Sequence, residues 1–207
     1  GLTGPANDLL NQRLPAIASD PEGDFVVVWQ SVGSAGNDNS EYSVQGQRYT
    51  SAGTATGGEF QVNTYTSSFQ STAAVGAGGD GSFVVAWDSM GSGEGDNSET
   101  SVHAQRFSAA GVAQGSEFQV NAYSTNYQWL PAVAVDGEGD FVVVWQSMGA
   151  SSGDTAGYSL HAQRYSAAGT ALGDPFQVNS YTTSDQTASA VAVDADGDFV
   201  VVWKSTG

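Results

Sequence analysis

The sequence contains no cysteine, which excludes disulfide bonds, thiolate catalysis and cysteine-ligated zinc. Basic residues are scarce: five Lys and Arg stand against 22 Asp and Glu, and the net charge is −17. Because so acidic a surface repels phosphate backbones and anionic lipid, we expect no nucleic-acid partner and no membrane insertion. No apolar run reaches transmembrane length, and no helical periodicity persists beyond about two turns, so helices are not expected.

The sequence does contain a strict internal repeat. Segments that begin at Phe25, Phe83, Phe141 and Phe199 read FVVVW, FVVAW, FVVVW and FVVVW, and each lies 58 residues after the one before. Such spacing indicates one supersecondary unit stacked on itself. We therefore divide the single repeat domain into a partial strand and linker (1–13), three units (14–71, 72–129 and 130–187) and a half unit (188–207).

The third copy shows what one unit contains. An alternating strand at 130–136 precedes a Gly/Asp turn, and the apolar strand 141–145, a polar loop, an alternating strand at 158–165 and a short strand at 176–179 follow. The second strand is apolar throughout, so both of its faces must be covered, as in a propeller blade. The sequence predicts an all-β fold, a β-propeller or propeller-like arc of four-stranded antiparallel units. The alternative is an open β-solenoid or an array of small sandwiches.

The last copy stops after its second strand, which leaves the apolar segment Phe199–Trp203 without a covering neighbour. An uncovered edge strand of this kind tends to associate with other chains. Three partners could cover it: the segment Gly1–Asn7, another copy of the chain, or the rest of a longer parent protein. We favour the longer parent.

The turn between the first two strands of a unit is rich in carboxylates. Oxygen ligands suit Ca²⁺, yet the second copy retains only Asp80, so no cofactor is required for folding. We expect plain hairpin turns, with weak Ca²⁺ sites as the alternative. The candidate metal ligands are Asp20, Glu22 and Asp24, then Asp136, Glu138 and Asp140, and finally Asp194, Asp196 and Asp198.

Other side chains are candidates for ligand binding. Long polar loops, where ligands often bind, carry an aspartate that recurs in phase, and a tyrosine follows the short fourth strand of each unit. Trp129 stands outside the repeat pattern, which suggests a contact surface. The candidates for binding a ligand, including a glycan, are Asp38, Asp96, Asp154, Tyr65, Tyr123, Tyr181 and Trp129.

Two further sets of repeated residues have a structural interpretation. Arginine occupies one position in each full unit, and in so acidic a chain we expect it to pair with a turn or loop carboxylate. A tryptophan ends each apolar strand, and we expect these rings to pack between units. The alternative is that they stack on sugars. The structural residues are Arg48, Arg106 and Arg164, and Trp29, Trp87, Trp145 and Trp203.

Nothing in the sequence points to catalysis. His103 and His161 share a position at which the first copy has Gln45, so imidazole is replaceable there. The sequence has no nucleophile elbow and no phosphate-binding glycine loop. A glycosidase needs a pair of carboxyl groups at a set separation, and no Asp or Glu stands out as unique and buried. We therefore expect that the protein is not an enzyme.

The motif GDFVVVWQS, followed by an acidic glycine-rich loop, QRY and EFQVN, resembles a repeat of large secreted or surface-attached bacterial proteins of the calcium-associated adhesin type. The resemblance extends from Leu14 to Gly207 and implies an extracellular or cell-surface location. It leads us to expect a non-enzymatic structural or adhesive module that binds through its rim loops. The alternatives are a carbohydrate-binding lectin and a self-assembling subunit of a surface layer or filament.

Overall fold

The computed structural model describes residues 11–32, 38, 41–91, 99–149 and 157–206, and these residues form an all-β structure. Across this part of the chain, no helix has the length and hydropathy needed to span a membrane. The strands are β1 (Gln12–Ser19), β2 (Phe25–Val32), β3 (Tyr42–Tyr49), β4 (Ala55–Gln61), β5 (Gln70–Ala77), β6 (Phe83–Met90), β7 (Thr100–Phe107), β8 (Phe118–Gln119), β9 (Gln128–Val135), β10 (Phe141–Met148), β11 (Tyr158–Tyr165), β12 (Phe176–Gln177), β13 (Gln186–Val193) and β14 (Phe199–Ser205).

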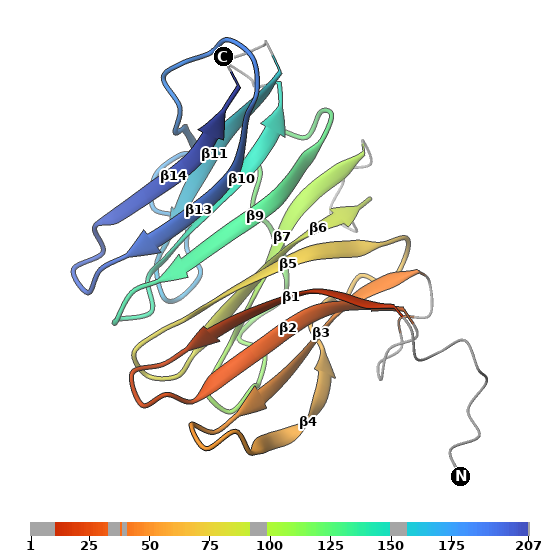
Figure 1. Cartoon of the computed structure of the whole chain (residues 1–207), viewed down its shortest axis with the longest axis vertical. Helices are drawn as coiled ribbons and strands as arrows, with labels where there is room; N and C mark the ends of the chain where they lie inside the picture. The colour runs from red at the N-terminus through yellow and green to blue at the C-terminus, as the bar shows by residue number, and fades with distance from the viewer. Residues whose placement is uncertain (1–10, 33–37, 39–40, 92–98, 150–156, 207) are drawn as a thin grey trace.

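Each repeat forms one antiparallel sheet with its strands in sequence order. Unit 1 contains β1–β4, unit 2 contains β5–β8, unit 3 contains β9–β12, and β13 and β14 form a half unit. The units follow one another along the longest axis of the molecule (Figure 1). The predicted fold class, tandem four-stranded antiparallel units in a propeller-like arc, is confirmed.

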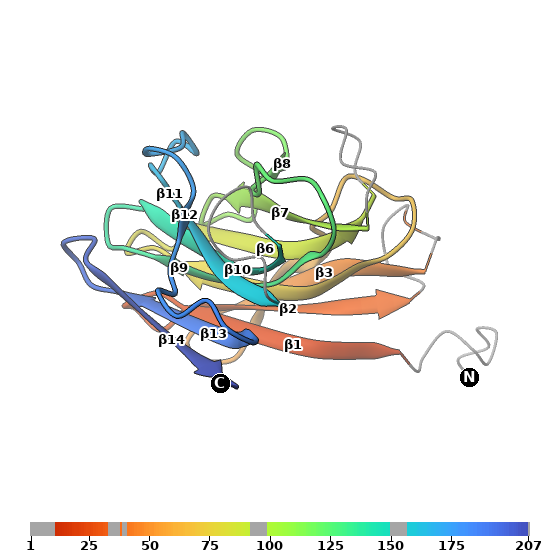
Figure 2. The ribbon, with the colours of Figure 1, turned by 90° about the horizontal axis from the view of Figure 1, so that it is seen from above.

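The first strands of successive units contact one another in the order β1, β5, β9 and β13. Figure 2 shows β1 and β13 on one side of the molecule and β8 and β12 on the opposite side, as expected for blades that share an inner edge. Each first strand begins with a glutamine, two residues before the boundary that we drew from the sequence. This glutamine is buried at Gln70, Gln128 and Gln186 and exposed at Gln12.

The hydrophobic core lies between the units. In unit 2 the odd-numbered residues of β6, such as Val85, pack against unit 1, and the even-numbered ones, such as Val84, pack against unit 3. The interface between unit 3 and the half unit repeats this arrangement with Val142 and Val201. Both faces of the second strand are therefore covered, which explains why its sequence is apolar at every position.

Every first strand contains a β-bulge near its start. The pairing register shifts there in all four first strands, in β5 for example between Ser71 and Ala74. The bulge places one residue of each unit in the left-handed region, with φ between 46° and 53°, at Leu14, Thr72, Leu130 and Ala188. None of these residues is glycine, so the periodic pattern alone does not reveal the bulge.

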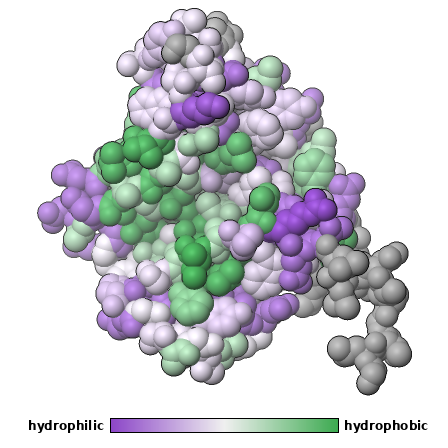
Figure 3. Space-filling model, in the orientation of Figure 1, coloured by the Kyte–Doolittle hydropathy of each residue, from purple (hydrophilic) through white to green (hydrophobic). Residues whose placement is uncertain are grey.

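The two ends of the arc expose residues that are buried between units elsewhere. Ile17 is 64% exposed, whereas Val75 at the matching position of unit 2 is 9% exposed. Val202 in the half unit is 59% exposed, whereas Val144 in unit 3 is fully buried. Figure 3 shows hydrophobic surface gathered over the first strands and β14. Coverage of these ends by other copies or by a longer parent remains a prediction, and Gly1–Asn7 lies outside the described residues.

Candidate functional site

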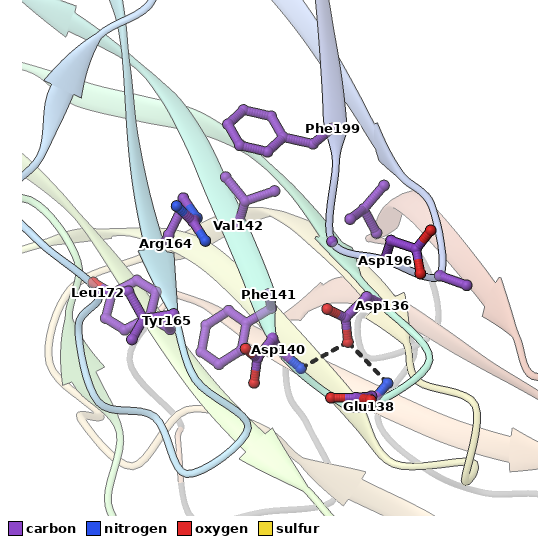
Figure 4. Close-up of a pocket in the computed structure, with 13 residues that line it drawn as sticks. Asp136, Glu138, Asp140, Phe141, Val142, Arg164, Tyr165, Leu172, Asp196 and Phe199 are labelled. Atoms are coloured by element: carbon purple, nitrogen blue, oxygen red, sulfur yellow. Dashed lines mark hydrogen bonds between the residues drawn. The ribbon is translucent and has the colours of Figure 1, made fainter.

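The carboxylates of the first-to-second strand turns hold the turns together. Asp136 Oδ1 accepts hydrogen bonds from the backbone N–H groups of Glu138 and Asp140, at 2.9 and 3.0 Å (Figure 4). Asp140 Oδ1 accepts from the N–H of Ala167 at 2.7 Å and so ties this turn to the next hairpin of unit 3. Gly139 has a φ of +90°, which explains why glycine stands at that position of the turn.

The other turns repeat this arrangement. Asp20 Oδ1 accepts from the N–H of Asp24, and Asp194 Oδ1 accepts from the N–H groups of Asp196 and Asp198. Hydrogen bonds from Ser82 lower the pKa of the Asp80 carboxyl in the second copy. Within the described ranges, no three acidic or histidine side chains gather closely enough to hold a metal ion. Calcium binding at Asp20, Glu22, Asp24 or their counterparts therefore stays a prediction.

Two of the three repeated arginines bind a backbone carbonyl group of the following unit. Arg48 Nη1 donates to the carbonyl oxygen of Ala109 at 2.6 Å, and Arg106 donates in the same way to Ala167 and also to Gln114. No ion pair between an arginine and a carboxylate occurs among the residues described. The predicted carboxylate partners are therefore wrong for Arg48 and Arg106, whose guanidinium groups bind backbone carbonyl groups instead.

Arg164 lies in a groove of about 240 Å³ between unit 3 and the half unit (Figure 4). The carbonyl groups that Arg48 and Arg106 bind lie 61 residues further along the chain, a position that for Arg164 falls after residue 207. The Arg164 side chain is exposed. The repeated tryptophans also differ from one unit to the next. Trp87 and Trp145 are buried between units, Trp29 is partly buried, and Trp203 is largely exposed on β14, which pairs with β13 alone.

The in-phase loop aspartates are represented by Asp38, since Asp96 and Asp154 lie outside the described residues. Asp38 is buried, and its Oδ2 accepts a hydrogen bond from Asn63 Nδ2 at 2.9 Å. This carboxylate therefore forms part of the buried hydrogen-bond network at the end of unit 1.

One asparagine in each unit positions the tyrosines that follow the fourth strand. Asn121 Oδ1 accepts from the N–H of Val102 at 2.7 Å, and its Nδ2 donates to the carbonyl of Tyr123 at 2.8 Å. The same two bonds hold Tyr65 and Tyr181 in their units. These tyrosines lie at the start of the next unit's first strand, where Tyr181 is exposed and the other two are half-buried.

Three aromatic side chains meet at this end of unit 3. The ring centroids of Tyr127 and Trp129 lie 6.1 Å apart, and those of Trp129 and Tyr158 lie 5.6 Å apart. Tyr127 is exposed, and a hydrogen bond to the Glu99 carboxylate, together with its negative charge, raises the pKa of the Tyr127 hydroxyl. We call Tyr127, Trp129 and Tyr158 the aromatic cluster.

The aromatic cluster is specific to unit 3. At the position of Tyr127 the other junctions have Phe69 and Asp185, and at that of Trp129 they have Ser71 and Thr187. Trp129 was singled out from the sequence for this reason. The partnership with Tyr158 and Glu99 could not be found from spacing, because those residues come from other strands of the sheet and from the preceding unit.

Sequence reasoning missed a buried carboxyl group on β6. Asp88 is 4% exposed, and desolvation raises the pKa of its carboxyl to about 6. Hydrogen bonds from Ser71 Oγ, at 2.6 Å, and from the Leu130 N–H oppose this shift only in part. The signal was present, since units 1 and 3 have Gln30 and Gln146 at this position. The statement that no acidic residue is unique and buried is therefore wrong.

A separate pocket of about 260 Å³ lies between units 2 and 3 at the same end as the aromatic cluster. We call it the unit 2–3 pocket. The loop after β8 contributes Ala122 and Tyr123, β10 contributes Trp145, and β11 contributes His161, whose ring lies against Trp145 with the centroids 6.0 Å apart. Asp174 and Pro175, which precede β12, complete its opening.

Structural comparison relates the fold to known proteins. A protein of unknown function from Dyadobacter fermentans superimposes with a TM-score of 0.66 at 14% identity, over 97% of this chain and 64% of that one. An α-L-arabinanase from Penicillium chrysogenum, solved with arabinobiose, gives 0.57 at 14% identity over 91% and 57%. An arabinanase from Bacillus subtilis gives 0.50 at 13% identity over 95% and 69%. The chain thus spans less than two thirds of the first two proteins.

No protein-family model matches the sequence, and no curated protein matches it. The structural neighbours share the fold, and several are glycoside hydrolases. This finding overturns two expectations from the sequence: that the protein is a non-enzymatic structural or adhesive module, and that an enzyme can be set aside. The first rested on the resemblance of the repeat motif, and the second rested on the absence of catalytic motifs from the sequence. The adhesin resemblance is supported only as a repeated antiparallel β unit.

Proposed function

We propose that the protein is carbohydrate-active and binds a glycan at the aromatic cluster. The observation that carries the proposal is the contact among Tyr127, Trp129 and Tyr158 at one end of unit 3, next to the Glu99 carboxylate. Sugar rings present C–H faces that pack on aromatic rings and hydroxyl groups that donate to carboxylates. The fold, shared with arabinanases, adds support from a source independent of the side chains.

The cluster suits an extended neutral glycan better than a single sugar. Tyr127 is exposed and Trp129 and Tyr158 are half-buried, so the three rings form an open surface instead of an enclosed cavity. A ligand on such a surface gains affinity from several weak contacts along its length. The extracellular or cell-surface location that the repeat motif implies is also part of this proposal, and it would bring the protein into contact with polysaccharides.

Affinity electrophoresis against soluble polysaccharides, including arabinan and xylan, tests the proposal. We expect retardation by at least one polysaccharide that Trp129→Ala reduces at least tenfold, because the central ring contacts both others. Tyr181→Ala is the matched control: it removes an aromatic ring that is 49% exposed and lies outside the cluster. Binding that survives Trp129→Ala but not Tyr181→Ala would reject the aromatic cluster as the site.

Glycoside hydrolysis is a second candidate function, favoured by Asp88. A glycosidase needs one carboxyl group that stays protonated near neutral pH, and burial gives the Asp88 carboxyl a pKa of about 6. Its side chain is buried beneath the bulge at Leu130, so a substrate would reach it only after that bulge moves. Release of reducing sugar from the retarded polysaccharide, lost in Asp88→Asn, would support hydrolysis, and its absence at all pH values would leave binding alone.

A further inference from the structure

The junction between units 1 and 2 contains a carboxylate that fills a cradle of hydrogen-bond donors. Glu117 Oε2 accepts from the backbone N–H groups of Thr64 and Tyr65, at 2.5 and 3.4 Å. Its Oε1 lies 3.9 Å from His103 Nδ1, and His103 Nε2 is within 3.0 Å of Ser101 Oγ. Two backbone amides of one unit and an imidazole of the next thus surround a single carboxylate.

The junction between units 2 and 3 repeats the cradle without the carboxylate. The backbone amides that correspond to those of Thr64 and Tyr65 belong to Ala122 and Tyr123, and neither has a hydrogen-bond partner among the described residues. His161 again bonds the strand serine through Nε2, at 3.1 Å from Ser159, so its Nδ1 edge corresponds to that of His103. The residue that corresponds to Glu117 is Pro175, whose side chain has no group that can accept these hydrogen bonds.

The unit 2–3 pocket is lined by Ala122, Tyr123, His161 and Pro175, so there is space at the position that corresponds to the Glu117 carboxylate. We propose that this pocket binds a ligand carboxylate, which takes the place that the Glu117 carboxylate occupies at the preceding junction. The amides of Ala122 and Tyr123 donate to it, and the imidazole of His161 lies beside it. The half-buried ring of Tyr123 borders the pocket, which favours a carboxylate carried on a sugar ring over a small free acid.

Two charges oppose this ligand and set the conditions for detecting it. Asp174 lines the pocket and is exposed, so it repels a bound anion, and the net charge of −17 does so at longer range. At about 0.15 M salt the screening length is about 8 Å, which removes most of the long-range term. Asp174→Asn should then strengthen binding by about threefold, the usual effect of one exposed charge at close range.

Titration of the ¹⁵N-labelled 207-residue chain with glucuronate, glucose and acetate tests the proposal by NMR. We expect glucuronate to shift the amide signals of Ala122 and Tyr123 with a dissociation constant on the order of 1 mM, as for a small ligand held by two charge-assisted bonds. Acetate should shift the same signals more weakly, and glucose should leave them in place. Acetate binding as tight as that of glucuronate would still support the carboxylate cradle and would identify a simple acid as the ligand.

Two variants place the residue of one junction at the corresponding position of the other. Pro175→Glu supplies the missing side chain and should abolish the shifts, whereas Glu117→Pro should open a second site, seen as new shifts of Thr64 and Tyr65. If Glu117→Pro fails to fold, Pro175→Glu decides alone, since it copies an arrangement that unit 2 already contains. Equal shifts with glucose, no shifts up to about 50 mM glucuronate, or an unchanged titration in Pro175→Glu would overturn the proposal. Because the readout is the amides of Ala122 and Tyr123, it is independent of binding at Trp129.

Discussion

Replacing Asp88 by asparagine should make the protein more stable at neutral pH and should remove part of its pH dependence. The folded-state pKa of Asp88, about 6, lies above the ordinary value of 3.8 because burial disfavours the charged carboxylate. A raised carboxyl pKa means that the wild-type group contributes most to stability below the unfolded pKa. That contribution is lost as the pH rises through the folded pKa.

The size of the effect follows from the two pKa values. Their difference is about 2 units, and each unit corresponds to 1.36 kcal/mol, so the total is about 3 kcal/mol. Most of this change falls between about pH 4 and pH 7, where the folded and unfolded states bind different numbers of protons. The side chain is 4% exposed, so solvent screening does not reduce the figure appreciably.

Urea unfolding of the wild type and Asp88→Asn across this pH range gives the measurement. The contributions of all other titrating groups are the same in both proteins and cancel in the difference between their unfolding free energies. The new amide adds only a constant that does not change with pH. We expect this difference to rise by about 3 kcal/mol in favour of the variant from acid to neutral pH. Asp80→Asn is the control with the opposite sign, because hydrogen bonds from Ser82 lower the pKa of Asp80. A difference that stays flat with pH would refute the reasoning.

Three further substitutions, two of them with a matched control substitution, test other parts of the structure. Arg106→Ala should destabilise the protein by about 1 kcal/mol in thermal unfolding, through loss of its bonds to Gln114 and to Ala167 of the next unit, while Arg164→Ala should have almost no effect. Val143→Ala, in the fully buried core, should cost about 2 kcal/mol, against less than about 0.5 kcal/mol for Val202→Ala, and equal costs would contradict the packing described here. Asp136→Ala should cost about 1 kcal/mol by urea unfolding, equally with and without Ca²⁺, and a cost that grows with Ca²⁺ would instead identify a metal site.

The repeat made the fold readable from the sequence. Four in-phase copies of FVV-Val/Ala-Trp identified the second strand, and its apolar residues on both faces required neighbouring sheets on both sides. The bulge at Thr72 was not readable, because it requires a left-handed residue and the sequence places Leu, Thr or Ala there instead of glycine.

Function was harder to read because it depends on departures from the repeat. Asp88 replaces the amide of Gln30 and Gln146 by a carboxyl on a shorter side chain, yet only the structure shows that this carboxyl is buried. Pro175 in place of Glu117 attracts no attention as a sequence change. The loss of the carboxylate matters only because the backbone amides of the preceding unit lack their acceptor. Those amides lie more than 50 residues away along the chain and face this position only after folding.

The unequal covering of the units has a consequence for how the molecule comes apart. In an array whose units contact only their neighbours, opening begins where one neighbour is missing and proceeds inward. The half unit, with Val202 in solvent, should therefore exchange its amide hydrogens first, and unit 2, enclosed on both faces, should exchange them last. Both the aromatic cluster and the unit 2–3 pocket adjoin this slowest part, so a ligand bound there would outlast repeated fraying of the ends.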